Sequence, residues 1–430
     1  MHTLITCGII ESSRMKKPLN ILVLADTIAS NSSGGKANMG LIQGFIDQGF
    51  DLKVLHYSRE EISLGRIPVL HIAEQKTNLS YLKAKTQLLF QRASGRNINK
   101  WVETRKGFSY THDYDVVSIK AALAQENPAH YDYVLALSYA SSFRAHKAIL
   151  QSPAWHAKFL AYIHDPYPMH SYPRPYDWVE PGHQFKRDFF VALFTKARHL
   201  IYPSSMLGEW MESYYPTGKN KAVIIPHLIR SDLKDTGVYP AYFNPALFNV
   251  LHAGSLMSAR NPMSLVRAFI RFLETVPEAQ EHARLVMVGG ASVYHKELHL
   301  IASKTRQLLL SLGQEPFELT YNMQQQAAVN VILEAKGPAS PFLPGKVPHC
   351  VVADKPILIL GPYYSETRNL LGMEYPYWGE INDEATITTL LTSLFTAWVA
   401  CSGNSTLNKP DIAAYLGAAS IDKAFKEMTT

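Results

Sequence analysis

Two cations follow loops in which a phosphate group could be held. Arg260 comes after the apolar segment 248–253, and Lys346 closes the loop Phe342-Leu343-Pro344-Gly345. A loop that ends in Gly-Lys and opens a helix presents free backbone N–H groups and a cation at the positive end of the helix dipole. We therefore predict a phosphate site that uses Arg260 and Lys346. The alternative for Arg260 is a solvent-facing side chain near a helix start.

A histidine and an aspartate stand together after another apolar segment. His164-Asp165 follows residues 158–163 directly. If that segment is a strand of an open parallel sheet, its carboxyl end is where ligands bind. The two side chains could then serve as acid/base or orienting groups. The alternative is a packed histidine beside an aspartate that caps the turn before Pro166.

The elements that position these residues alternate between strands and helices. Helical patterns follow Gly34-Gly35 and Pro262, and occur near residues 79–92 and 295–312. Strands alternating with helices predict a parallel, doubly wound sheet, here twice in tandem, with the site in the cleft between the two halves. The predicted strands are 20–25, 51–56, 131–137, 158–163, 199–203, 222–226, 248–253, 284–288, 317–320, 329–333 and 356–360.

The length of the chain, 430 residues, suits two domains rather than one core. We predict an N-terminal Rossmann-like domain over 20–235 and a C-terminal one over 236–405, because residues 231–245 lack a clear period and resemble a connection. Residues 1–19 are predicted to be an N-terminal extension, which we expect to be disordered.

Composition excludes several classes of protein. The chain is 47% hydrophobic and 18% charged with a formal charge of +6, which is ordinary for a globular protein and compatible with anionic substrates or a membrane surface. No run of Lys and Arg suggests nucleic-acid binding. Three cysteines without a C-x-x-C pair argue against a disulfide framework and a zinc site, so we expect a cytoplasmic protein. No apolar run of eighteen residues is present, and no motif predicts a metal, a P-loop or a serine nucleophile.

Six segments, in their order along the chain, resemble the GT-B glycosyltransferases, particularly the retaining family 4 of bacterial sugar transferases. The resemblance covers roughly residues 20–400, with 60–125 unmatched. The segments are Gly34-Gly35; the strand ending in His164-Asp165; 223–227, similar to "viPNG"; 252–256 with 260–262, similar to "yvGrl…KNp"; 285–289; and 340–361, similar to "SPFLPSKlfEYlaaGKPil".

The resemblance implies a role for each matching residue. Arg260 and Lys346 would hold the diphosphate of a nucleotide-sugar and compensate charge as the sugar–phosphate bond breaks. His164 would contact the transferred sugar or its leaving phosphate. Gly34 and Gly35 would let the first loop approach the donor phosphate or the acceptor.

The same resemblance places the rest of the donor. The backbone from Phe342 to Gly345 would offer N–H groups to the sugar, and Tyr321 and Asn322 would border the nucleobase. No cofactor and no metal is implied, because cations and a helix end would take the role of the metal.

One position departs from the family pattern. The family has a Glu that accepts hydrogen bonds from the ribose hydroxyls, and here that residue is His349, with Pro341 at the partner position eight residues earlier. A neutral histidine has one acceptor nitrogen, whereas a carboxylate has two oxygens. Asp354 also replaces the usual glycine before Lys355-Pro356.

The sequence thus predicts a metal-independent, retaining glycosyltransferase. It would move a sugar from a nucleotide-diphosphate sugar to a glycan or lipid-linked acceptor in bacterial surface polysaccharide synthesis. Peripheral contact with the inner face of the membrane is part of this interpretation, and residues 406–430 are expected to form helices that return to the N-terminal domain. The alternatives are a catalytically weakened GT-B scaffold or binding subunit, and a nucleotide-sugar epimerase of similar fold.

Overall fold

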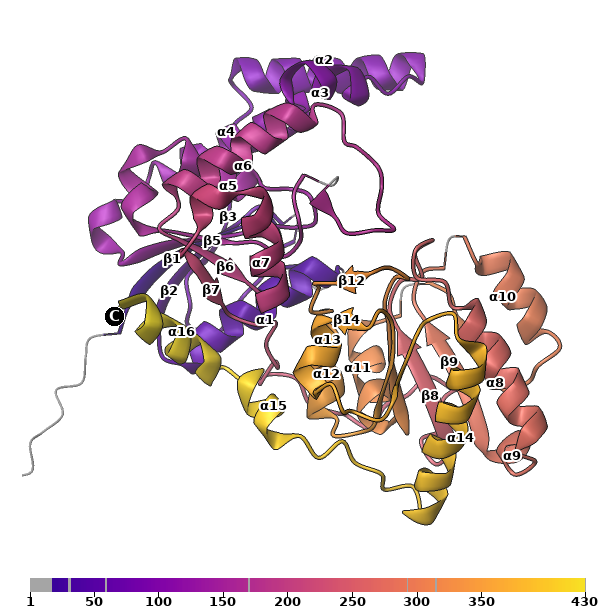
Figure 1. The fold of residues 1–430 in the computed structure, drawn as a ribbon. Coiled ribbons are helices and arrows are strands. Elements are labelled where there is room, and N and C mark those ends of the chain that lie inside the picture. Colours follow the sequence, from indigo (N-terminus) through magenta and orange to yellow (C-terminus); the bar gives the residue numbers. More distant parts are fainter. Residues whose placement is uncertain are drawn as a thin grey trace, which may run out of the picture.

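The structure is a computed structural model that describes residues 18–29, 32–58, 60–168, 171–291, 293–313 and 315–429. Two α/β domains, each built on a parallel sheet, lie side by side (Figure 1). The predicted fold class, two Rossmann-like doubly wound domains, is confirmed. Residues 1–17 of the predicted N-terminal extension lie outside the described residues.

The N-terminal sheet has seven parallel strands in the order β3-β2-β1-β4-β5-β6-β7. The order reverses between β1 and β4, which is the point where open sheets of this kind bind ligands. The strands are short and almost fully apolar because helices cover both faces. Their bounds are β1 Asn20–Ala25, β2 Asp51–His56, β3 Val69–His71, β4 Tyr133–Leu137, β5 Phe159–Tyr162, β6 His199–Tyr202 and β7 Ala222–Ile224.

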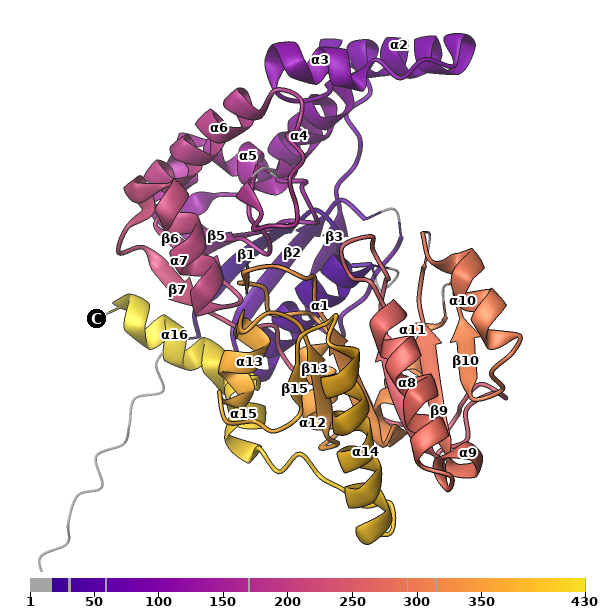
Figure 2. The same ribbon diagram turned by 45° about the vertical axis from the view of Figure 1, so that its right-hand side comes forward.

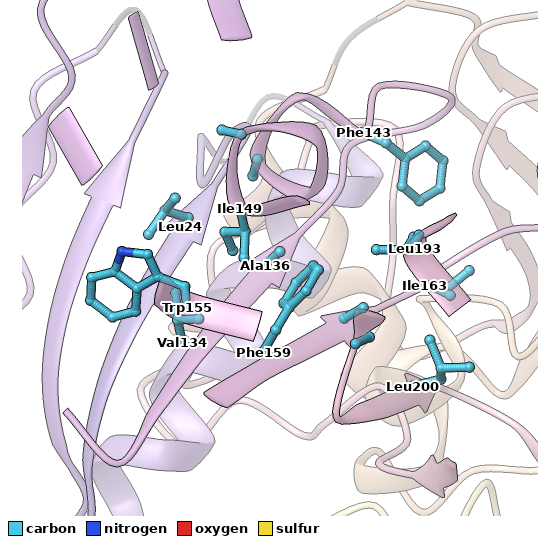
Figure 3. Close-up of a cluster of buried hydrophobic side chains, with 14 of the residues drawn as sticks. Leu24, Val134, Ala136, Phe143, Ile149, Trp155, Phe159, Ile163, Leu193 and Leu200 are labelled. Carbon is cyan, nitrogen blue, oxygen red and sulfur yellow. The ribbon is translucent and has the colours of Figure 1, made fainter. Parts of the chain in front are cut away.

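Helices from both ends of the chain cover the two faces of this sheet. One face packs against α4 (Tyr110–Leu123), α5 (Arg144–Leu150), α6 (His183–Lys196) and α7 (Ser205–Tyr214). Figure 3 shows part of this cluster, with Leu24 and Ala136 from the strands near Ile149 of α5. The other face packs against α1 (Ser33–Asp47) and α16 (Ala419–Thr429).

The C-terminal sheet has six parallel strands in the order β10-β9-β8-β11-β13-β15. A separate two-stranded ribbon pairs β12 with β14. The strands are β8 Phe248–Ala253, β9 Ala283–Val288, β10 Leu308–Ser311, β11 Val329–Leu333, β12 Ala339–Ser340, β13 Ile357–Leu360, β14 Tyr364–Ser365 and β15 Trp378–Gly379.

Helices again cover both faces of the second sheet. One face of this sheet packs against α8 and α14, and the opposite face packs against α11, α12, α13 and α15. The helices of this half are α8 Met263–Thr275, α9 Ala279–His282, α10 His295–Ala302, α11 Phe317–Gln326, α12 Val347–Val352, α13 Glu366–Leu371, α14 Glu384–Ala400 and α15 Pro410–Tyr415.

Two predicted elements of this half are wrong. The helix predicted over 295–312 ends at Ala302, and Leu308–Ser311 is strand β10, because its backbone pairs with β9 at the edge of the sheet. The strand predicted over 317–320 is the first turn of α11. Its four residues alternate between apolar and polar, but Pro316 immediately precedes a helix that buries Tyr321 and Met323.

The end of the chain returns to the first domain. After α14 the chain passes through α15 and then α16, which lies against the N-terminal domain in both views (Figures 1 and 2). There Ile421, Ala424 and Phe425 are buried in the same cluster as residues of β1 and α1. The ring of Phe425 makes edge contacts with Phe45, Phe50 and Tyr133.

A helical arm projects from the other end of the N-terminal domain. It consists of α2 (Leu79–Ser94) and α3 (Asn99–Lys106), which extend away from both sheets (Figures 1 and 2). Only Ala84 and Gln87 of α2 and Val102 of α3 are buried.

Candidate active site between the two domains

His164 lies at the centre of a hydrogen-bonded chain at the carboxyl end of the first sheet. The Nδ2 group of Asn38, on α1, donates to the carbonyls of Thr27 (2.9 Å) and Ser138 (3.0 Å). Its Oδ1 therefore accepts from Nε2 of His164 at 2.7 Å. This bond fixes the tautomer of His164, so Nδ1 of His164 accepts from Nε2 of His227 at 3.2 Å.

His164 and His227 are both neutral near pH 7. Burial lowers the pKa of His164 well below its usual value, and the neighbouring His227 lowers it further. Burial likewise lowers the pKa of His227 to about 4. His227 comes just after β7, and its ring faces the loop that contains Gly345, where an added Cβ would lie 3.9 Å from Nδ1. His227 was not predicted as a site residue, although it follows the junction segment 223–226.

Asp165 does not act as the partner of His164. The pKa of Asp165 is raised by burial, and the causes that oppose this are the charge of Arg260 and a hydrogen bond with Tyr172. Asp165 thus faces the cation from the opposite domain, while His164 faces Asn38 and His227. The two predicted catalytic residues are adjacent in sequence but belong to separate interactions.

Arg260 and Lys346 enter the same region from the C-terminal domain. The Nζ atom of Lys346 lies 3.2 Å from Nδ1 of His252 and 3.2 Å from the carbonyl of Val331. Burial, together with the charge of Arg260, lowers the pKa of Lys346 to about 7. The Nε atom of Arg260 is buried without a hydrogen-bond partner among the described residues. The structure therefore places these two cations within electrostatic reach of each other.

A glycine makes room for Lys346. Gly254, at the end of β8, has a φ of 154°, and a Cβ at this position would lie 3.4 Å from Nζ of Lys346. Gly289 packs directly on it: a Cβ at Gly289, where φ is 119°, would lie 2.5 Å from the carbonyl oxygen of Gly254. Positive φ and close approach both favour glycine at these two strand ends.

A buried carboxyl group that was not predicted from the sequence lies on the same side. Glu334 follows β11, and burial raises its pKa to about 7. One oxygen accepts a hydrogen bond from Thr367 at 2.8 Å, and the charge of Arg260 lowers the pKa. A single acidic residue at a strand end has no distinguishing pattern in sequence, so only the fold identifies it.

His349 lies in an aromatic and cationic environment. Its ring contacts Phe317 and Tyr321 edge-on, with ring centroids 5.5 and 5.6 Å away. Burial, together with the charges of Arg230 and Lys36, lowers the pKa of His349 to about 4.

Lys36 and Arg230 reach this position from the N-terminal half of the chain. The Nζ atom of Lys36 lies 4.2 Å from the centre of the Phe317 ring, and Arg230 lies 6.0 Å from the same ring. Arg230 forms an ion pair with Asp232, whereas Lys36 lies over the Phe317 ring. Neither cation was predicted, although Lys36 directly follows the glycine pair and Arg230 lies three residues after His227.

The glycine pair serves the first turn of α1. The Ser32 side chain caps this helix and accepts from the Gly35 N–H at 3.1 Å. A Cβ at Gly35 would lie 2.0 Å from the Ala29 carbonyl, and one at Gly34 would lie 2.9 Å from the Tyr139 ring. The Gly35 N–H therefore already has an acceptor, the Ser32 side chain. The absence of a side chain at Gly35 allows the close approach of the Ala29 carbonyl.

Tyr321 and Asn322 differ in how they could meet a nucleobase. Asn322 is buried, and its Nδ2 group donates at 2.8 Å to both Thr236 Oγ1 and the Val238 carbonyl in the interdomain connection. This side chain is committed to holding the connection. Tyr321 is different, because its ring lies against His349.

Aromatic rings from the N-terminal domain lie over the loop that contains Lys346. The ring of Phe342 is 5.4 Å from that of Tyr172 and 6.4 Å from that of Tyr176, between centroids. Trp178 extends this group, with its centroid 5.6 Å from that of Tyr176. Gly345, three residues after Phe342, is exposed. Together the rings form a wall that is suited to the apolar faces of a sugar or a base.

Among the described residues, no group of three or more His, Cys, Asp or Glu side chains is placed to hold a metal ion. The charged groups of the site are instead the cations Lys36, Arg230, Arg260 and Lys346, with the half-buried Asp165 and the buried Glu334. Such an arrangement can bind an anion with several oxygens between the two domains.

Several solved structures share this two-domain arrangement. A glycosyltransferase from Rickettsia africae is 11% identical and aligns over 96% of this chain and 100% of its own, with a TM-score of 0.59. The α,α-trehalose-phosphate synthase (UDP-forming) from Burkholderia xenovorans, in complex with glucose-6-phosphate, is 11% identical over 96% and 100% of the two chains, with a TM-score of 0.62.

A third neighbour is WaaG, a glycosyltransferase involved in lipopolysaccharide biosynthesis, with 11% identity, coverage of 93% and 94%, and a TM-score of 0.50. No protein-family model and no curated protein matches the sequence. The structural likeness establishes the fold, which is the GT-B fold of glycosyltransferases.

Proposed function

We propose that this protein is a glycosyltransferase that moves a sugar from a nucleotide-diphosphate sugar to a glycan or lipid-linked acceptor. The reaction proceeds with retention of configuration and without a metal ion or cofactor, in the synthesis of a bacterial surface polysaccharide. The GT-B neighbours support this class of reaction, and the involvement of WaaG in lipopolysaccharide biosynthesis is an analogy for the pathway.

The observation that carries the proposal is the pair Arg260 and Lys346 at the domain boundary, where the charge of Arg260 reaches Asp165 of the N-terminal domain and Gly345, next to Lys346, lies beside the ring of His227. Two cations at one anchor point can hold a diphosphate and take up the charge that develops as the sugar–phosphate bond breaks. The neutral His164, fixed in one tautomer by Asn38, can contact the sugar without repelling these cations. The rings of His349 and Tyr321 form a second aromatic surface, against which the nucleoside would lie.

The test is nucleotide binding by calorimetry with UDP, GDP and ADP. Arg260→Ala and Lys346→Ala should each weaken the binding of the preferred nucleotide by about 1–3 kcal/mol, which is the range for a lost charge-assisted hydrogen bond. Arg271→Ala, on the exposed side of α8, removes the same charge away from the site and should leave the affinity unchanged. The proposal fails if the wild type binds none of the three nucleotides at millimolar concentration. If Arg260→Ala and Lys346→Ala both bind nucleotide as tightly as the wild type does, the roles assigned to these two residues are refuted.

Two alternative functions predict different results. A GT-B scaffold with weakened catalysis would bind nucleotide without consuming any nucleotide-sugar. An epimerase of similar fold would convert a donor without any acceptor. A screen of nucleotide-sugars, with product analysis in the presence and absence of glycan acceptors, separates all three.

We also propose that the helical arm of α2 and α3 contacts an anionic membrane surface, which would bring the site to a lipid-linked acceptor. Residues 76–106 contain eight Lys and Arg residues and one acidic residue, Glu103. Large apolar side chains stand among these cations and are 40–64% exposed: Leu79, Leu82, Leu88, Leu89, Phe90 and Trp101. Apolar groups and cations on one projecting arm match the interface of an anionic bilayer. No helix among the described residues is long and apolar enough to cross a bilayer.

Co-sedimentation with phosphatidylglycerol vesicles tests this contact. The double variant Lys83→Glu/Lys85→Glu should lose vesicle binding, because each cation near an anionic surface contributes about 1 kcal/mol. The matched control is Lys296→Glu/Lys304→Glu, which reverses two exposed charges in the second domain. Equal binding by the two double variants would contradict the proposal.

A further inference from the structure

One segment of the N-terminal domain runs from the candidate site to the base of the helical arm. Residues 171–182, the aromatic strap, end where α6 begins and approach the loop 342–345. The strap also touches the second domain elsewhere, because a Cβ at Gly337 would lie 2.2 Å from the carbonyl oxygen of Arg174. Its conformation therefore decides where its three rings stand above the loop 342–345. These rings are Tyr172, Tyr176 and Trp178.

The start of the strap is fixed within the first domain. The indole N–H of Trp210 donates to the carbonyl of Ser171 at 2.6 Å, and the side chain of Tyr172 forms a hydrogen bond with Asp165. These contacts hold the first residues of the strap, whereas residues 177–179 are exposed. The position of the outer rings thus depends on how the other end of the strap is held.

The far end of the strap is fixed by one buried ammonium group. Lys186, on α6, is 5% exposed, and its Nζ atom lies 3.0 Å from Glu103 of α3 and 3.5 Å from Glu180 of the strap. Gly182, where φ is 68°, packs against the same helix of the arm: a Cβ there would lie 1.9 Å from the carbonyl oxygen of Glu103. The arm and the strap are therefore fastened at one point, and Lys186 is the cation that their two carboxylates share.

The two ion pairs of Lys186 have different consequences. The pair with Glu103 fastens α6 to the arm, which is a structural role. The pair with Glu180 acts on the strap, because Glu180 lies two residues after Trp178 and fixes the backbone that carries this ring. A buried ion group that loses one partner leaves an uncompensated charge. Without Lys186, the Glu180 side chain would turn toward solvent, and the rings would lose their fixed position.

We propose that Lys186 is a positioning residue that holds the aromatic strap above the loop 342–345 through Glu180, and so sets the affinity for the sugar part of the donor. The inference rests on the proposed function and adds to it a residue that lies outside the candidate site. Aromatic rings suit the apolar faces of a sugar, whereas the diphosphate is assigned to Arg260 and Lys346. Displacement of the rings should therefore weaken the binding of a nucleotide-sugar and leave the binding of its nucleotide unchanged.

Calorimetry on the full chain separates the two parts of the donor. The probes are UDP, GDP and ADP, paired with UDP-glucose, GDP-mannose and ADP-glucose, and the measured quantity is the dissociation constant of the nucleotide-sugar divided by that of its nucleotide. For the nucleotide that the wild type prefers, this ratio should rise about fivefold or more in Lys186→Met. Lys186→Arg keeps the charge and should restore the wild-type ratio. The proposal is overturned if the ratio is unchanged in Lys186→Met, or if Lys186→Arg raises it equally.

Two further variants keep the test decisive even if Lys186→Met does not fold. Glu180→Ala removes the strap side of the ion group, and Glu103→Ala removes the arm side by the same change. Only Glu180→Ala should raise the ratio and speed up hydrogen exchange, about tenfold, at the Tyr176 amide, which donates to a carbonyl within the strap at 3.1 Å. Asp177→Ala, at an exposed position of the strap, is the control and should change neither quantity. Equal effects of Glu180→Ala and Glu103→Ala would show a structural role alone and overturn the proposal.

The two levels of proposal fail separately. Nucleotide binding with a ratio that responds to neither Lys186→Met nor Glu180→Ala would preserve the glycosyltransferase and overturn this role of Lys186. A protein that binds no nucleotide would overturn the glycosyltransferase, and faster exchange at the Tyr176 amide in Glu180→Ala alone would still show that Lys186 holds the strap.

Discussion

Lys346 is held in a place that disfavours its own charge. Its amino group is buried beside His252 and the Val331 carbonyl, and Arg260 adds a second positive charge, so its pKa falls to about 7. In the unfolded chain the same group keeps the usual pKa of about 10.4. Between these two values the unfolded state binds more protons, and the contribution of Lys346 to stability therefore rises with pH. A bound diphosphate would place negative charge next to Lys346 and would therefore raise the pKa of its amino group again.

Nucleotide affinity should consequently fall with rising pH. The diphosphate is fully ionised above pH 7.5, since its last pKa is about 6, so Lys346 is the group at the site that loses charge there. The dissociation constant of the preferred nucleotide should rise by up to about tenfold per pH unit above 7. Lys346→Arg keeps a permanent charge and should flatten the profile. Calorimetry between pH 7 and 9 measures both, and a flat wild-type profile would contradict the role of Lys346.

His349→Glu should be tolerated and should strengthen nucleotide binding. A carboxylate in this position would lie near the cations Lys36 and Arg230, which now face a neutral ring. It would also offer two acceptor oxygens to a ribose in place of one nitrogen. We expect the dissociation constant to stay equal or to fall by up to about tenfold, an effect of about 1.4 kcal/mol. A large loss of affinity would show that the imidazole has a partner of its own.

The sequence predicts which residues lie near the domain boundary where a motif and a strand end coincide, and their roles there stay predictions. Arg260 and His164 each follow an apolar segment that forms a strand, and Lys346 closes the loop that opens helix α12, so the parallel sheets and this loop bring them to the same region. Lys36, Arg230 and Glu334 could not be predicted in this way. Their positions depend on how one domain faces the other and on which strand end lies beside Arg260, and these are properties of the assembled fold.

At the scale of elements, α16 completes the core of a domain to which it is distant in sequence. Phe425 is 3% exposed and contacts three aromatic rings of the first domain. Phe425→Ala should lower the free energy of unfolding by about 3–5 kcal/mol, since it leaves a cavity among rings that cannot close in. Urea denaturation followed by tryptophan fluorescence measures this loss.

The matched control is Phe90→Ala, which removes the same ring from a position that is 47% exposed. It should change the free energy of unfolding by no more than about 0.5 kcal/mol. Similar losses in the two variants would mean that α16 does not contribute to the core as described.

Elements were predictable where burial on both faces makes a strand continuously apolar. Asn20–Ala25 and Phe248–Ala253 have this pattern, and their predicted bounds match the structure. The edge strand Leu308–Ser311 has no such protection, and its pairing with β9 decides against a helix. At Phe317–Thr320, four residues are too few to separate a period of 2 from one of 3.6.

At the scale of the whole molecule, the candidate site belongs to neither domain alone. Lys36 and His164 come from the first domain, whereas Arg260 and Lys346 come from the second. Contacts such as the hydrogen bond of 2.6 Å from Ser204 to the Pro341 carbonyl hold the two domains together next to this region. A ligand that binds these cations should therefore stabilise both domains at once.

Nucleotide binding should be visible as coupled protection of the two domains. At a nucleotide concentration 100 times the dissociation constant, the free energy of unfolding should rise by about 2.7 kcal/mol. Hydrogen exchange should slow both in α1, which carries Lys36, and in α12, which follows Lys346. Lys36→Met should confine the protection to the C-terminal domain, because it removes the cation that reaches across to Phe317. Wild-type protection restricted to the C-terminal domain would mean that the donor contacts that domain alone, and Lys36 would then have no part in the site.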